Sequence, residues 1–279
     1  GQLPYSRFRH YARCTKPSAN PPMNHIATAR LHILLARDAP VGLVIRRGPS
    51  RQFATFLWHR KRDTFELGQW AKGRIYVERC DLSPDGKYFI YFVLNAKWHT
   101  ETKGSWTAIS LAPWLKALTL YPQGDTWGGG GLWTSNNTFW LSGSCYLPAL
   151  KESPDFKKDD SLDGCVGNPY YYRLKRDGWT CSTHTQAGRK HVYRICKPLE
   201  KGWSLEQNYP EWTYELLHDK NCLVIPCPDW QWADLDGDRL VYAERGKLYS
   251  ARLDREGLTE VTELYDFNPF QFEPIIAPY

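Results

Sequence analysis

The chain has 279 residues, 42% of them hydrophobic and 24% charged, which is typical of a globular protein. No run of about 18 apolar residues occurs, so we expect no membrane-spanning helix and no membrane partner. The net charge of +6 falls to +2 without residues 1–22, because that segment holds four of the 36 basic residues and no acidic one. No basic stripe remains, and we expect no nucleic-acid partner.

Residues 1–22 have no apolar segment and do not resemble a secretory signal. We expect a disordered or expression-derived extension, with an Arg-rich transit peptide as the alternative. The folded domain is expected to begin at Met23 and to cover residues 23–279. Without a secretory signal, the predicted location is cytoplasmic.

Eight cysteines lie at positions 14, 80, 145, 165, 181, 196, 222 and 227, with no C-x-x-C and no zinc-type spacing. We therefore expect reduced thiols, no metal site and no cofactor. A disulfide or a metal site between residues 145 and 227 is the alternative, and His184 and His191 could contribute to it.

In chain order, short β-rich runs are separated by turn residues, which favours an all-β domain of antiparallel strands. Examples are "VGLVIRR" (41–47), "KYFIYFV" (87–93), "NTFWLSG" (137–143), "DRLVYAE" (238–244) and "LTEVTELYDF" (258–267). Helical periodicity is scarce. The segment 147–169 is polar and rich in Pro and charge, and we expect a long surface loop there.

Turns recur near positions 38, 85, 136 and 236, and the last gap is about twice the others. A fifth copy is therefore expected inside it, at either Ala187-Gly188 or Asp177-Gly178. A second set of hairpins falls between these turns, at 56–70, 105–121, 192–207 and 248–264. Each unit of about 50 residues thus contains four antiparallel strands, which is typical of a propeller blade.

"CDLSPDGKYFIYF" (80–92) and "ADLDGDRLVYAE" (233–244) carry a family resemblance. The first is similar to the repeat of TolB-type, WD40-like β-propellers, in which S-P-D-G joins the innermost strand to the next. The resemblance implies a fold and no function. With the repeat count, it predicts a single-domain, five-bladed β-propeller of four-stranded antiparallel blades. The C-terminal residues 268–279 are expected to close the ring by pairing with an early strand such as 29–36.

"GDTWGGGGLW" (124–133) aligns with "VERC" (77–80) and "WQWA" (230–233), which places its glycines on an innermost strand. A phosphate-binding loop would need Lys-Ser or Lys-Thr after the glycines, whereas Leu132-Trp133 follows. A strand without side chains allows something to approach the backbone closely. The neighbour is either a packed side chain, such as Trp127, Trp230 or Trp232, or a ligand.

Two functions are compatible with these features. The first is a non-catalytic propeller that binds a protein or peptide at its channel mouth. Its candidate binding residues are Asp125, Trp127, Gly128, Gly129, Trp98, Trp230 and Trp232. The alternative is a glycosidase-like hydrolase acting on a carbohydrate, with Asp81, Asp125 and Asp234 converging in the channel. Glu78 is a further acid expected on that side. No catalytic motif decides whether the chain is an enzyme.

Overall fold

The computed structural model describes residues 28–143, 147–164, 168–187, 190–220 and 222–279. Within these ranges the chain is mostly β and forms five sheets that follow one another along the sequence. The first contains β1 (Arg30–Leu35), β2 (Val41–Arg47), β3 (Gln52–His59) and β4 (Thr64–Lys72). The second contains β5 (Arg74–Ile75), β6 (Asp81–Leu82), β7 (Tyr88–Leu94), β8 (Ser105–Leu111) and β9 (Ala117–Pro122).

The third sheet contains β10 (Gly131–Trp133), β11 (Thr138–Leu141) and β12 (Lys157–Lys158). The fourth contains β13 (Thr180–Ala187), β14 (Lys190–Pro198), β15 (Trp203–Tyr209), β16 (Thr213–His218) and β17 (Leu223–Cys227). The fifth contains β18 (Trp230–Asp236), β19 (Arg239–Glu244), β20 (Lys247–Leu253) and β21 (Leu258–Asp266). Neighbouring strands are antiparallel except β11 and β12. One α-helix is described, α1 (Pro169–Arg176).

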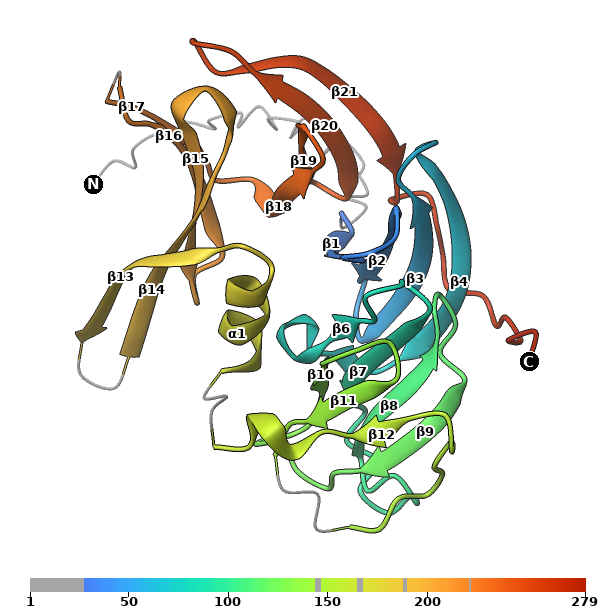
Figure 1. The fold of residues 1–279 in the computed structure, drawn as a ribbon. Helices are drawn as coiled ribbons and strands as arrows, with labels where there is room; N and C mark the ends of the chain where they lie inside the picture. Colours follow the sequence, from blue (N-terminus) through green and yellow to red (C-terminus); the bar gives the residue numbers. More distant parts are fainter. Residues whose placement is uncertain (1–27, 144–146, 165–167, 188–189, 221) are drawn as a thin grey trace, which may run out of the picture.

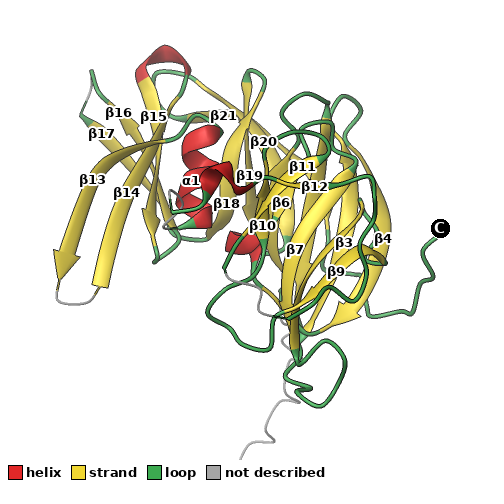
Figure 2. Ribbon diagram, turned by 60° about the horizontal axis from the view of Figure 1, so that its bottom comes forward, coloured by secondary structure: helices red, strands yellow, loops and turns green. Residues whose placement is uncertain are grey.

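The sheets surround a central space, and α1 lies on its inner side between the third and fourth sheets (Figure 1). β1 contacts both β18 and β6, β6 contacts β10, and α1 contacts β10 and β13. The β13–β14 hairpin extends away from the other sheets (Figure 1, Figure 2). The expectation of an all-β chain with repeated antiparallel sheets is confirmed. Uniform four-stranded units are not found, because the described second and fourth sheets have five strands each and the third has three.

The predicted repeat turns meet at one end of the inner strands. The Asp38 amide donates to the Pro84 carbonyl (2.8 Å), and the Asp85 amide donates to Asn136 Oδ1 (3.0 Å). We call this end the turn end. The opposite end carries the β7–β8 loop, residues 95–104, and the β9–β10 loop, residues 123–130, and we call it the loop end.

Helix α1 was not expected. The Asn168 side chain accepts from the amides of Tyr170 and Tyr171, and Pro169 occupies the first helical position, which together start the helix. The helix ends at Asp177-Gly178, one of the two candidate fifth turns. The other candidate, Ala187-Gly188, falls between β13 and β14, and Gly188 lies outside the described residues.

The segment "VERC" is not a strand, contrary to expectation. Val77–Arg79 forms a 3₁₀ turn between β5 and β6, and both of these short strands pair with β7. The segment 147–169 is also partly structured. It contributes β12, a 3₁₀ turn at Asp160–Leu162 and a bridge between Lys151 and Leu120.

The C-terminal segment does not pair with residues 29–36, so that expectation is wrong: β1 pairs with β2, and residues 267–279 contain no strand. The segment instead packs on the first sheet, where Arg46 donates to the carbonyls of Phe267 (2.8 Å) and Phe270 (2.9 Å). Aromatic and aliphatic side chains complete this core, namely Phe267, Phe270, Phe272 and Ile275 against Phe56, Trp58 and Trp70. Side-chain packing therefore replaces backbone pairing.

Candidate functional site

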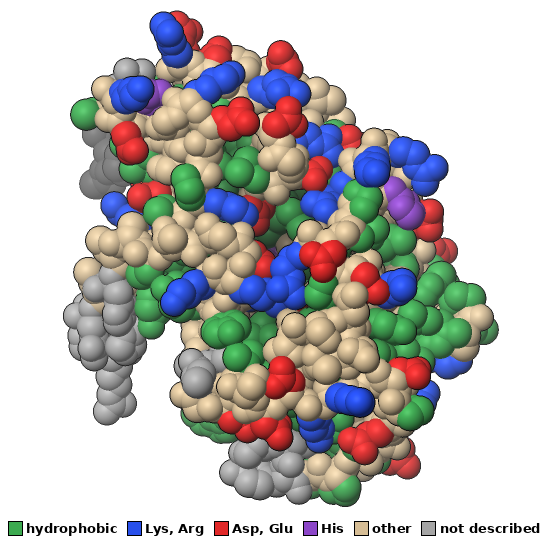
Figure 3. Space-filling view, in the orientation of Figure 1, with side chains coloured by type: hydrophobic (Ala, Val, Ile, Leu, Met, Phe, Trp, Pro, Cys, Tyr) green, Lys and Arg blue, Asp and Glu red, His purple; other side chains and the backbone are tan. Residues whose placement is uncertain are grey.

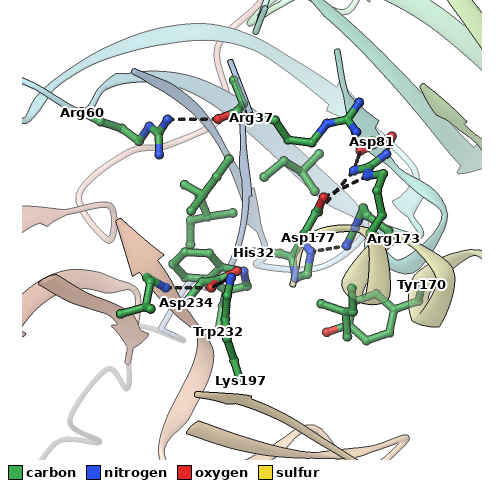
Figure 4. A pocket seen from close by; sticks show the side chains of 17 residues that line it. His32, Arg37, Arg60, Asp81, Tyr170, Arg173, Asp177, Lys197, Trp232 and Asp234 are labelled. Atoms are coloured by element: carbon green, nitrogen blue, oxygen red, sulfur yellow. Dashed lines mark hydrogen bonds and ion pairs between the residues drawn. The ribbon is translucent and has the colours of Figure 1, made fainter. Parts of the chain in front are cut away.

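A pocket of about 270 Å³ lies at the centre of the molecule, between β1, α1, β14 and β18 (Figure 4). Charged side chains dominate its lining, which includes Arg37, Arg60, Arg173, Arg176, Lys197, Asp81, Asp177 and Asp234. In the space-filling view, basic and acidic side chains meet around the middle of the face (Figure 3). Sequence reasoning anticipated two of these residues, Asp81 and Asp234.

Asp81 is buried and engaged on both oxygens. Arg176 donates to it through Nη1 (2.7 Å) and Nη2 (3.0 Å), and the Trp133 amide donates from the neighbouring sheet (2.8 Å). Arg176 also contacts Asp177 through Nε (2.8 Å). Arg176 thus binds Asp81 in a bidentate ion pair and also binds Asp177. Because Asp81 lies in the second sheet and accepts from Trp133 of the third, this ion pair connects α1 to both sheets.

Asp234 lies on β18 and faces Lys197 of β14, with 2.5 Å between its Oδ1 and Nζ. The Leu235 amide (2.7 Å) and the Trp179 indole (3.3 Å) also donate to it. Burial raises the pKa of the Asp234 carboxyl, and the charge of Lys197 opposes that rise. This pair joins the fourth and fifth sheets across the pocket.

The pocket is closed on one side by His32, Tyr170 and Arg173. Arg173 Nη2 lies 3.1 Å from His32 Nε2, and because a guanidinium can only donate, Nε2 must be an unprotonated acceptor. Burial, followed by the charge of Arg173, lowers the pKa of His32 well below its usual value, so the ring is neutral. The buried Tyr170 hydroxyl donates to Gln207 Oε1 (2.9 Å).

Trp230 and Trp232 are both buried, at 6% and 5% exposure. Trp232 lines the pocket. Trp230 stacks on Tyr242, with 4.2 Å between ring centroids, and forms part of the core. The pocket therefore has one of the two predicted tryptophans in its wall.

The glycine-rich segment forms a braced loop at the loop end. Asp125 Oδ1 accepts from the amide of Trp127 (3.0 Å), and Arg79 donates to the carbonyls of Thr126 (3.0 Å) and Gly128 (2.6 Å). The amide of Gly130 donates to Thr107 Oγ1 (2.7 Å). These bonds fix the backbone of residues 125–130.

Three of the four glycines, Gly129, Gly130 and Gly131, allow close approach by the protein itself. A Cβ on Gly129 would lie 2.2 Å from the Phe92 ring, and one on Gly130 would lie 2.1 Å from the Arg79 carbonyl oxygen. Both residues have positive φ, +100° and +81°. The neighbours are Phe92, Arg79 and, for Gly131, the Trp140 carbonyl oxygen (2.3 Å from the added Cβ), and none of the three tryptophans that the sequence suggested.

The braced loop presents Trp127 to solvent, with 92% of the residue exposed, while Trp98 on the adjoining loop is 49% exposed. Ser105, the first residue of β8 directly after the adjoining loop, donates through Oγ to the Asp125 carbonyl (2.6 Å). Asp125 lies here and is not among the residues that line the central pocket. The predicted residues thus separate into two groups, with Asp81, Asp234 and Trp232 at the pocket and Asp125, Trp127, Gly128, Gly129 and Trp98 near the loop end.

Three arginines at the loop end were missed. Arg30 and Arg47 are directly opposite each other on β1 and β2, and Arg74 begins β5. Burial lowers the pKa of Arg47 to about 10, and the charges of Arg30 and Arg74 add to that effect while Glu78 opposes it. Arg47 Nε is buried without a hydrogen-bond partner. Their positions on separate strands gave no local sequence signal.

No group of three His, Cys, Asp or Glu side chains that could hold a metal occurs in the described ranges. The five cysteines there are free, with Cys80 and Cys227 buried. Cys14, Cys145 and Cys165 lie outside these ranges. The side chains of His184 and His191 are also outside the part of the molecule that the structure describes. The described part of the chain contains no helix long and apolar enough to span a bilayer.

Comparison with known proteins gave no match to a family model and no match among curated proteins. Among solved structures, the chain is similar to one in the "Crystal Structure of Mitotic Checkpoint Complex". The alignment has 7% identity and a TM-score of 0.23, and it covers 92% of this chain and 88% of the other. A likeness of that size carries no argument about fold or function.

Proposed function

We propose that this chain is a five-bladed β-propeller of the TolB-type, WD40-like kind that binds a protein or peptide partner at its loop end and catalyses no reaction. In this proposal the five sheets are the blades, and α1 occupies the inner position of the fourth. Support for the architecture comes from the five successive sheets and from the repeat turns that meet at one end.

Trp127 carries the proposal for function. Its side chain is almost wholly exposed, yet the loop beneath it is held by hydrogen bonds: Arg79 donates to two loop carbonyls, and loop amides donate to Asp125, Thr107 and the Ser142 carbonyl. Because the backbone beneath the indole is already fixed, a partner that buries Trp127 orders its side chain without also having to order the loop. Tryptophan is also enriched at the energetic centres of protein interfaces.

The surrounding charges favour an acidic partner. Arg30 and Arg74 are exposed, and neither has an ion pair with another described residue. Arginine, like tryptophan, is over-represented among interface residues that dominate binding. Cations at the same end of the inner strands as an exposed indole would attract acidic groups and orient them during encounter.

The test is a pull-down from a native extract followed by affinity measurement on any captured protein. The variant is W98A/W127A, and the matched control is I276A, because Ile276 is also 92% exposed but lies in the C-terminal segment. We expect the double variant to weaken binding by roughly 30-fold or more, as loss of an interface hot spot does. Unchanged capture by W98A/W127A would contradict the proposal.

Carbohydrate hydrolysis has weaker support. Asp81 and Asp234 do line one pocket, and burial raises the pKa of Asp234, as a general acid requires. However, Arg176 and Lys197 occupy these carboxylates, and Asp125 does not line the pocket. Incubation of D81N and D234N with chromogenic glycosides, beside the wild type, tests this alternative. Turnover that both substitutions abolish would favour hydrolysis.

A further inference from the structure

The central pocket has a surplus of positive charge that its own carboxylates do not balance. Five cationic side chains line it, against three carboxylates. Arg176 is paired with Asp81 and Asp177, and Lys197 with Asp234. Arg60 is paired with Asp236 (2.9 Å), which lies outside the lining. Arg37 and Arg173 are left.

Arg173 is the more informative of the two, because it is only 4% exposed. Its guanidinium donates to the carbonyls of Val77 (3.3 Å) and Cys80 and to the neutral His32. None of these acceptors carries a charge, and no described carboxylate makes an ion pair with Arg173. A buried charge without a counter-charge is costly, so native proteins normally pair it or supply a ligand.

Arg37 follows β1 and lines the same pocket. It is exposed, and within the described residues it forms no ion pair. Its side chain can therefore reorient toward an occupant, whereas three hydrogen bonds hold Arg173 in the wall. Figure 4 shows both side chains at the pocket. One fixed and one movable guanidinium suit an oxyanion, because each presents a planar fork of donors.

We propose that the central pocket binds the oxyanion group of a small ligand, a phosphate or a carboxylate, between Arg173 and Arg37. The volume of about 270 Å³ is close to the lower end of the range for small-molecule sites, about 300–1,000 Å³. The ligand is therefore a small molecule. This site is separate from the loop-end surface and does not depend on a protein partner.

The experiment is a thermal-shift titration of the purified full chain with inorganic phosphate, malonate and chloride at matched ionic strength. A ligand that binds the folded state raises the melting temperature as its concentration rises. We expect phosphate or malonate, but not chloride, to do so. A response to phosphate alone indicates a phosphate-bearing ligand, and a response to malonate alone indicates a carboxylic acid.

Two variants locate the site. R37Q is at an exposed position and is expected to weaken the binding roughly tenfold, the usual effect of losing one charge-assisted contact. R51Q is the matched control, since Arg51 is exposed and forms no ion pair with described residues. R173M is expected to abolish the response, and R37Q decides if R173M does not fold. Equal responses of chloride and the other anions, or of R37Q and R51Q, would overturn the proposal.

Discussion

The two ends of the inner strands differ in whether their charged side chains are paired. At the turn end, Asp81, Arg176, Lys197 and Asp234 form buried pairs that join different sheets and α1. At the loop end, Arg30 faces Arg47 across two strands, and Trp127 stands in solvent. The buried ion pairs of the turn end stabilise the fold. The facing arginines and the exposed indole of the loop end have no evident role in stability. This contrast is why the partner surface is assigned to the loop end.

The largest expected effect is at a loop-end glycine. Gly130 has a φ of +81°, and in Gly130→Ala the new Cβ would lie 2.1 Å from the Arg79 carbonyl oxygen. We expect a loss of about 3–5 kcal/mol in the free energy of unfolding, from backbone strain and overpacking together. Gly237→Ala at the turn end has φ +65° and open space around it, and should lose only about 1 kcal/mol. Urea denaturation measures both, and equal losses would contradict the close packing of the loop.

The next effect is at the turn end. Asp81→Asn removes the partner of Arg176 in a site that is 2% exposed. Because an uncompensated charge is left, the free energy of unfolding should fall by about 3 kcal/mol. Asp238→Asn is the control, since its pair with Arg252 is exposed on both sides and its loss should not be measurable. A turn end that tolerates D81N would mean that its ion pairs do not hold the sheets together.

His32 makes stability depend on pH. Its folded pKa lies well below its unfolded value, so the stabilisation is present above about pH 6.5 and is lost as the pH falls below it. Between pH 7.5 and 5.5 we expect His32 to account for a loss of about 1–1.5 kcal/mol. Urea denaturation at both pH values should show that H32Q loses less of its free energy of unfolding than the wild type does. The control H99Q changes an exposed histidine that forms no ion pair with a described residue, and it should keep the wild-type loss.

The last prediction is that removing a cation changes the free energy of unfolding in opposite directions at the two ends. Arg47→Met removes a cation whose pKa burial has lowered to about 10, so stability should rise by about 1 kcal/mol. Lys197→Met leaves Asp234 buried without its cation, so stability should fall. Thermal denaturation of the two variants checks the signs. A fall for both would show that loop-end arginines also stabilise the fold.

The sequence predicted the turn end better than the loop end, for a physical reason. Asp85-Gly86 and Asp236-Gly237 are local turn signals, and they recur at the repeat spacing. Helix α1 also had local signals, Asn168 and Pro169, but the repeat spacing indicated a candidate turn at Asp177-Gly178 instead. No sequence pattern could place Arg176 beside Asp81 or Arg173 beside His32.

The loop end depends on long-range packing. The glycines at 128–131 predicted a close approach, but only the structure identifies Phe92, Arg79 and Trp140 as the neighbours. Likewise, Arg30 and Arg47 are 17 positions apart in sequence, and their opposition depends on the register of β1 and β2. The Pro-rich C-terminal segment was expected to pair as a strand, yet Arg46 binds its carbonyls individually. Side-chain contacts of this kind leave no periodic signal.

The central claim is that the loop end, and not exposed apolar surface in general, receives a partner. The most direct measurement is site-specific photo-crosslinking in a native extract, with a photoreactive phenylalanine analogue placed at position 127 or at position 276. Both residues are 92% exposed, so their accessibility to chance collisions is the same. A discrete adduct from position 127 alone is the predicted result. Identical adducts from both positions, or none from position 127, would contradict the account.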